Sequence, residues 1–173
     1  MADTPAFLTL RRNRDRAGRH EVLVRRVLLA LVCLILLAGL LNVFGQRPQT
    51  SEASTSAASL KVYAANHVRG GVIYEARFTI TARDDVKNAM LVLDSGWVEG
   101  ITINTTAPGP IAEASRDGKL VYTLGHVPAG TSYILFLQLQ VNPTNIGHRS
   151  QDVALYDGGK FLTSVDRSVS VFP

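Results

Sequence analysis

The residues whose types and spacing could do chemistry are Asp94, Ser95 and Gly96, which follow the apolar run 89–93. A carboxylate held at the end of an apolar strand can activate water when a second carboxylate shares its proton. The motif occurs once, so two chains would have to meet to supply the pair. Asp-Ser-Gly is also an ordinary turn sequence after a strand, and the bulky Trp97 follows it directly. We therefore expect no catalytic residue here.

Other kinds of catalytic or ligand-binding spacing are absent from the sequence. The acidic loop 83–88 could offer oxygen ligands to calcium, but its two aspartates are balanced by an arginine and a lysine, as in a solvated loop. No glycine-rich phosphate loop or nucleophile elbow occurs. The four histidines are scattered, without the spacing of a zinc site: His20, His67, His126 and His148. We expect no metal and no cofactor.

Trp97 is the one tryptophan of the chain and the candidate interaction residue. Its place after a buried-looking strand fits two interpretations. It fills the end of the core, or it stands exposed as an anchor for a partner protein.

The segment 27–45 is long and apolar enough to anchor the rest of the chain in a membrane as a helix. Val27–Phe44 has eighteen residues, no charge and one polar side chain, Asn42. At about 1.5 Å per residue such a helix covers about 27 Å, close to the hydrocarbon thickness of a bilayer. We predict one transmembrane helix with Arg25, Arg26, Val27 and Phe44 as its membrane-anchoring residues.

Charge is concentrated at one side of this segment. Residues 1–26 carry seven arginines against three acids, whereas residues 45–173 carry eleven basic and eleven acidic residues. Basic residues beside a span stay on the cytoplasmic side, which predicts a cytoplasmic tail at 1–26 and a C-terminal domain outside the cell membrane. The arginines have no interleaved aromatic residues, so we expect the lipid bilayer as their partner and no nucleic acid.

A cleaved signal peptide is the main alternative to an anchor. Val43 and Gly45 are small or modest residues at the minus-three and minus-one positions and allow cleavage after Gly45. The apolar run is nevertheless longer than the 7–15 residues of a signal core. We therefore expect an uncleaved signal-anchor and test the alternative by the mass of the mature protein.

The remaining chain changes character twice. Residues 46–59 are rich in Ser, Thr, Ala and Pro and lack bulky apolar residues, which predicts a flexible linker. From residue 60 onward, apolar residues alternate with polar ones in short segments separated by turn residues every 8–12 positions. No cysteine lies outside the span, so packing alone must hold this part together. The pattern predicts an all-β immunoglobulin-like sandwich over 60–173.

Two segments carry a family resemblance. Residues 70–81 lead from a Gly-Gly turn into an alternating strand with a tyrosine, and residues 124–143 combine a Leu-Gly step, a Pro/Gly turn and a long strand. Together they resemble immunoglobulin-like repeat modules of bacterial surface proteins, of the CARDB-like type, here as a single copy on a membrane anchor. The resemblance implies an adhesive, spacer or partner-binding unit and assigns no chemistry.

We therefore expect a membrane-anchored, extracytoplasmic β-sandwich that acts as a non-enzymatic protein-interaction or accessory module, with an unknown membrane or cell-envelope protein as its partner. One alternative is a small subunit or assembly factor of a membrane complex, in which the span matters more than the domain. The other is a dimeric aspartic-type protease through Asp94, Ser95 and Gly96.

Overall fold

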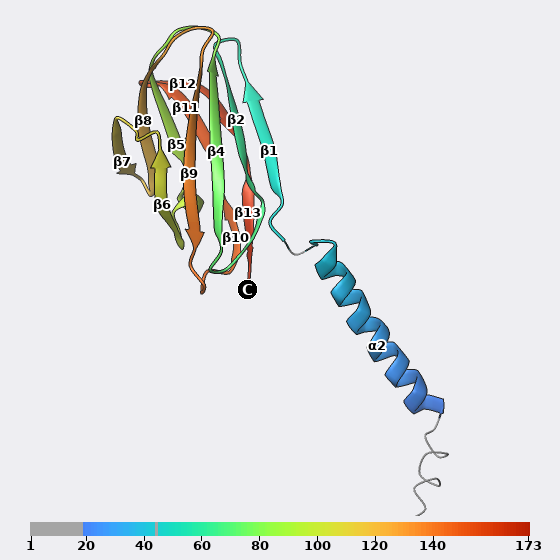
Figure 1. Ribbon diagram of the computed structural model, residues 1–173. Coiled ribbons are helices and arrows are strands. Elements are labelled where there is room, and N and C mark those ends of the chain that lie inside the picture. Colours follow the sequence, from blue (N-terminus) through green and yellow to red (C-terminus); the bar gives the residue numbers. More distant parts are fainter. Residues whose placement is uncertain (1–18, 44) are drawn as a thin grey trace, which may run out of the picture. The chain divides into compact units, whose positions relative to one another are not determined.

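The computed structural model describes residues 19–43 and 45–173. The chain divides into two compact units, Met1–Phe44 and Gly45–Pro173. The described part of the first unit forms the apolar helix α2, and the second unit is a multi-sheet all-β sandwich (Figure 1). This confirms the predicted fold class. The anchoring prediction for Phe44 and most of the basic tail fall outside the described residues.

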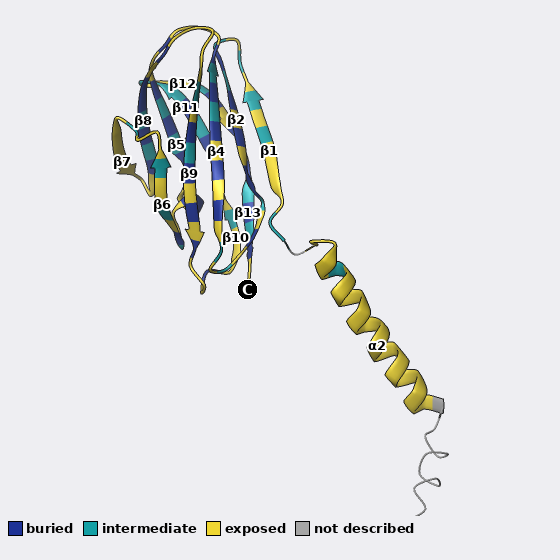
Figure 2. Cartoon of the chain, in the orientation of Figure 1, coloured by how far each residue is buried: buried dark blue, intermediate teal, exposed yellow. Residues whose placement is uncertain are grey.

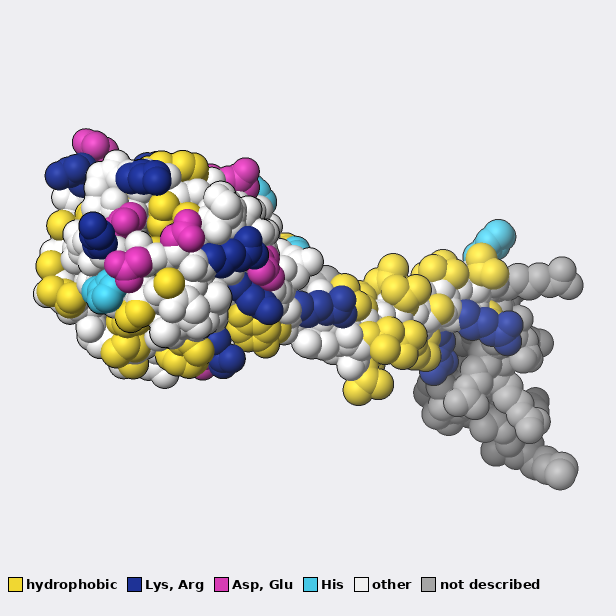
Figure 3. Space-filling model, turned by 90° about the horizontal axis from the view of Figure 1, so that it is seen from above, with side chains coloured by type: hydrophobic (Ala, Val, Ile, Leu, Met, Phe, Trp, Pro, Cys, Tyr) yellow, Lys and Arg dark blue, Asp and Glu magenta, His cyan; other side chains and the backbone are white. Residues whose placement is uncertain are grey.

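Helix α2 runs over Arg19–Leu40, so the helix begins before the predicted span and ends earlier than residue 45. It ends because Asn42 adopts a left-handed φ of 54°, which closes a turn after Gly39. Residues 20–40 are long and apolar enough to cross a bilayer, a property that anchors and signal sequences share. Hydrophobic side chains cover α2, and the exposed Arg25 and Arg26 lie near its start (Figure 3).

The second unit has two five-stranded antiparallel sheets and a smaller sheet. The first large sheet has the order β1-β2-β4-β9-β6 and the second the order β12-β11-β5-β8-β7. In the three-stranded sheet β10-β13-β3, β13 pairs antiparallel with β10 and parallel with β3. The strands are β1 Pro48–Ser54, β2 Ala58–Ala65, β3 His67–Arg69, β4 Ile73–Ala82, β5 Val86–Leu93, β6 Ile101–Ala107, β7 Ala112–Arg116, β8 Lys119–Val127, β9 Ser132–Val141, β10 Gly147–Ser150, β11 Val153–Asp157, β12 Lys160–Val165 and β13 Ser168–Phe172.

The core lies between the two five-stranded sheets. Strand β4 alternates exposed and buried residues along its length, and β8 and β9 do the same over most of theirs. The inward residues include the fully buried Phe78, Leu91 and Leu137 (Figure 2). Two-residue periodicity in the sequence therefore identified both the strands and their inward faces.

The predicted linker at 46–59 is wrong over most of its length. Pro48–Ser54 forms β1, which pairs with β2 over seven residue pairs as the edge of the first large sheet, and β2 already begins at Ala58. An edge strand needs only one hydrogen-bonded neighbour and little side-chain burial, so Ser, Thr and Ala suffice. Ser51 and Ala53 are half-buried, and the other residues of β1 are exposed.

Candidate protein-binding face

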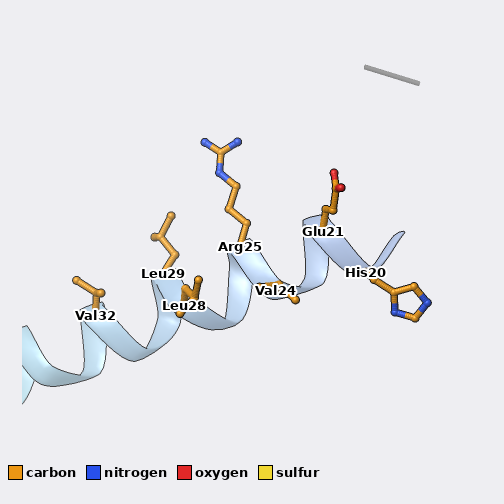
Figure 4. Close-up of a pocket in the computed structure, with 7 residues that line it drawn as sticks. All are labelled: His20, Glu21, Val24, Arg25, Leu28, Leu29 and Val32. Atoms are coloured by element: carbon orange, nitrogen blue, oxygen red, sulfur yellow. The ribbon is translucent and has the colours of Figure 1, made fainter. Parts of the chain in front are cut away.

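A hollow of about 580 Å³ in the first unit is lined among described residues by α2 alone. Figure 4 shows Glu21, Arg25 and Leu29 projecting from one side of this helix. The hollow is therefore the flank of a single helix and not a binding cavity.

Trp97 lies in the core of the β-sandwich. It belongs to the short 3₁₀ helix η2, Ser95–Trp97, and none of its surface is exposed. Its ring contacts Phe78, and its indole Nε1 donates a 3.0 Å hydrogen bond to the carbonyl oxygen of Gln151. The prediction that Trp97 fills the core is confirmed, and its assignment as an exposed interaction residue is wrong.

Gly96 explains why a glycine stands in the Asp-Ser-Gly motif. A Cβ at this position would collide with the carbonyl oxygen of Ser150 in β10. The close approach lets η2 pack against β10 and brings Trp97 into the core. Gly96 therefore has a structural role in joining the smaller sheet to the rest of the sandwich.

Asp94 is a surface ion-pair residue in this fold. Its Oδ1 lies 3.5 Å from Lys119 Nζ, and its backbone N–H donates to the carbonyl oxygen of Asp152. A hydrogen bond from the Ser150 side chain lowers the pKa of Asp94 most, burial raises it, and the backbone of Ser95 and Lys119 lower it further.

Arg167 supplies the charge buried next to Trp97. Its guanidinium lies 5.0 Å from the centroid of the Trp97 ring, and its Nη2 donates to the carbonyl oxygens of Ala64 and Ala65 and to Asn66 Oδ1. Burial lowers the pKa of Arg167 to about 10, so it stays protonated at neutral pH. The cation–π contact and the bonds of Nη2 compensate part of its lost hydration, whereas its buried Nε and Nη1 have no hydrogen-bond partner among the described residues. This cluster is structural.

No group of His, Cys, Asp or Glu in the described ranges 19–43 and 45–173 has the arrangement of a metal site. His126 Nε2 instead pairs with Asp85 Oδ1 at 2.6 Å on the surface. The acidic loop 83–88 therefore directs one of its two aspartates to a neighbouring strand.

The outward side of the sheet β12-β11-β5-β8-β7, here called the groove face, is mainly apolar over two neighbouring cross-strand rows. Half-buried but accessible residues on three strands form its centre, and the ring of Phe161 lies edge-on to that of Tyr156 at one end. In strand order, the first row is Phe161, Tyr156, Met90, Thr123 and Ala112, and the second row is Ser164, Ala154, Val92, Val121 and Ala114. The rows line two hollows of about 490 and 310 Å³ that share Val92, Lys119 and Tyr156, so they form one shallow groove.

A third row, called the charged row, crosses the same face next to Val92 and Val121. Its two halves have opposite signs. The row continues the strand pairing and consists of Asp166, Asp152 and Asp94 on the side of β12, β11 and β5, then Lys119 and Arg116 on β8 and β7. Asp166, Lys119 and Arg116 are exposed, and the other two aspartates are half-buried.

The outward side of the other large sheet differs in character. There the guanidinium of Arg77 lies between the rings of Tyr63 and Phe136, 5.7 and 4.9 Å from their centroids. Glu75 pairs with Arg77, and Gln138 continues this polar surface. Ile73, Ile134 and Phe136 are apolar residues on this side, and across β4 and β9 they pair with the polar Gln140, Thr79 and Arg77. On the groove face, apolar residues pair with one another across more than two neighbouring strands.

Sequence reasoning did not find the groove face. The apolar run 89–93 predicts a buried strand, but Met90 and Val92 are only half-buried and face the groove. The sequence did contain a signal for this face, because three strands each have an apolar residue on their outward side: Met90, Val121 and Tyr156. Without the strand order, nothing in the sequence placed these residues side by side.

Comparisons with known proteins identify no family. No protein-family model and no curated protein matches the chain. Among solved structures, it is similar to CaCohA2 from Clostridium acetobutylicum, with 15% identity, a TM-score of 0.47 and coverage of 68% of this chain and 92% of that one.

The chain is also similar to the chitin-binding domain of a chitinase from Pyrococcus furiosus, with 13% identity, a TM-score of 0.40 and coverage of 64% and 95% of the two chains. For the FixG-related protein from Vibrio parahaemolyticus the values are 13%, 0.39, 68% and 98%. With identities this low and TM-scores below 0.5, no ligand or partner is carried over to this chain. The resemblance to the CARDB-like type stays a prediction.

Proposed function

We propose that this chain is a single-pass membrane protein whose β-sandwich lies outside the cytoplasm and binds a protein through the groove face, without catalysing a reaction. The observation that carries the proposal is the adjoining apolar rows centred on Met90, Val92, Val121 and Tyr156. An antiparallel sheet that faces water on one side normally places polar residues there. A contiguous apolar patch with a charged border is typical of a protein-binding surface.

The membrane part of the proposal is supported by α2 and by the charge distribution. The helix is apolar from Val27 to its end, and the basic excess of the chain lies in residues 1–26, which include the first turns of the helix. The β-sandwich has equal numbers of basic and acidic residues, so no overall positive charge draws it to nucleic acid. We infer that α2 inserts into the bilayer and that the β-sandwich binds the partner protein.

Site-specific photo-cross-linking in intact cells tests the proposal. A photoreactive amino acid at Val121, in the centre of the groove face, should form an adduct of defined mass with a protein. The same group at Ile134, on the outward side of the other sheet, is the matched control and should give little adduct. Equal patterns at the two positions, or no adduct at Val121, would contradict the proposal.

A second variant separates binding from folding. Val92→Glu places a charge on the groove face, where the side chain can still reach water, and should abolish the Val121 adduct while leaving the circular dichroism spectrum unchanged. An adduct that persists in this variant would show that the cross-linker reports chance proximity.

A further inference from the structure

The charged row has an acidic half and a basic half, so the rows of two copies can pair with opposite charges facing each other. This points to a second copy of the chain as the partner that binds the groove face. We propose that the groove faces of two copies of this chain pack against each other around a two-fold axis that runs parallel to the strands, between β5 and β8. The inference rests on the proposed function, because it assumes that the groove face binds a protein. It adds that this protein is a second copy of the chain.

The signs along the charged row select this axis. Rotation about it brings β5 of one copy opposite β8 of the other, so Asp94 faces Lys119 of the second copy. One strand further out, Asp152 faces Arg116 of the second copy, and symmetry repeats both pairs. An acidic half therefore meets a basic half twice in a single contact.

A different two-fold axis in the plane between the two groove faces gives a poor contact. An axis perpendicular to the strands would turn the charged row onto the apolar rows of the second copy. Asp94 and Lys119 would then lose water without gaining a partner across the contact, which is costly for ionised groups. The axis parallel to the strands avoids this cost because each row meets its own counterpart.

The apolar rows also match around the proposed axis. Val92 faces Val121 of the second copy, and Met90 faces Thr123 of the second copy, so the centre of the contact is apolar. Sheets with roughly aligned strands pack about 10 Å apart through interlocking side chains of this size. The outlying Phe161, which is 53% exposed, lies at the border and not in the centre.

This symmetry agrees with anchoring in a single membrane. Rotation about an axis leaves the height along that axis unchanged, so Gly45 of both copies lies at the same level. Two α2 helices can therefore enter one bilayer. Confinement to the same membrane raises the effective concentration of one copy near the other and favours a contact of modest area.

Cysteine cross-linking between differently tagged full-length chains tests the dimer. In a Cys33→Ala background, one copy carries Val92→Cys and the other Val121→Cys, both in native membranes with an added oxidant. A disulfide-linked product that carries both tags is expected. The matched control uses Thr79→Cys and Ile134→Cys, which pair across β4 and β9 on the outward side of the other sheet; it should give at least about tenfold less product. Equal yields in the two experiments would overturn the proposal.

Charge reversal tests the pairing itself. Lys119→Asp should lower the yield of the Val92–Val121 product by about tenfold or more, because it opposes two acids twice across the contact. Combining it with Asp94→Lys restores opposite signs within each copy and between copies, and should recover the product. A double variant that folds normally by circular dichroism but gives no product would overturn the proposed axis.

The two experiments also separate the dimer from the more general function. A Val121 photo-adduct with a different protein, without any product that carries both tags, would overturn the dimer and leave protein binding through the groove face in place. Absence of both products would overturn both proposals.

Discussion

At the scale of single residues, the Asp-Ser-Gly motif shows how one sequence can fit a catalytic and a structural role. Asp94 ends β5 beside Lys119, and Gly96 allows η2 to approach β10. Trp97 then enters the core and contacts the guanidinium of Arg167. Asp94 and Gly96 therefore each have a structural reason. Its chemistry can be tested through stability as well as through activity.

Gly96→Ala should destabilise the sandwich strongly. The added Cβ collides with the backbone of β10, which cannot move aside as a flexible side chain can, so we expect a loss of about 3 kcal/mol in the free energy of unfolding. Urea unfolding of the full-length chain in detergent, followed by Trp97 fluorescence, measures it. Gly109→Ala is the control, because a Cβ there meets nothing within 4 Å. Similar stability of the two variants would contradict the role of Gly96.

Asp94→Asn tests the ionisation of the motif. The pKa of Asp94 is lower in the folded chain than its ordinary value, so the carboxylate stabilises the fold above pH 4 and this contribution is lost as the pH falls through the folded pKa. We expect Asp94→Asn to cost less than about 1 kcal/mol at pH 7, because the group is near the surface, and progressively less as the pH falls through the folded pKa of Asp94. Unfolding curves of both proteins across this range provide the measurement.

The opposite pH dependence would contradict this interpretation. An Asp94 that gained a proton in the folded state, as one member of a proton-sharing pair does, would make the wild type relatively more stable as the pH falls. The same variant tests the protease alternative, since proteolysis that survives Asp94→Asn cannot depend on this carboxylate.

At the scale of elements, the sequence predicted strands wherever apolar residues alternate over five or more positions. β4 and β9 are examples, and Asp157-Gly158-Gly159, which joins the antiparallel β11 and β12, is a turn sequence typical of hairpins. β1 could not be predicted in this way, because an edge strand of small polar residues has no buried side to produce alternation. The groove face was missed for a related reason, since it depends on the order of five strands and not on any one of them.

Hydrogen exchange distinguishes the strand β1 from the linker that its composition suggests. In an antiparallel edge strand, alternate backbone amides bond to the neighbour and the others face water. About half of the amides in 48–54 should therefore exchange slowly in the full-length chain, whereas all should exchange at the unprotected rate in the isolated peptide. Mass spectrometry of peptides that cover this segment measures the difference. Unprotected exchange throughout 48–54 would contradict the pairing of β1 with β2.

At the scale of the whole molecule, the chain joins a bare apolar helix to a sandwich whose two outward sides differ. The helix α2 has almost no buried residue, and only a bilayer or other apolar surroundings can remove this surface from water. The apolar core of the sandwich is already removed from water, because it lies between two large sheets. In the proposed function, membrane insertion and protein binding belong to separate units, and we expect that each can be changed without unfolding the other.

Cysteine labelling can establish the topology of this arrangement. In a Cys33→Ala background, a cysteine at Ile134 should react with a membrane-impermeant maleimide in intact cells, because the sandwich is expected outside. A cysteine at Ala17, in the basic tail, should react only after the membrane is permeabilised, because arginines beside a span stay in the cytoplasm. The labelled protein should keep the mass of the full 18.7 kDa chain. Labelling of Ala17→Cys in intact cells would reverse the orientation, and loss of about 45 N-terminal residues would show that α2 belongs to a cleaved signal peptide.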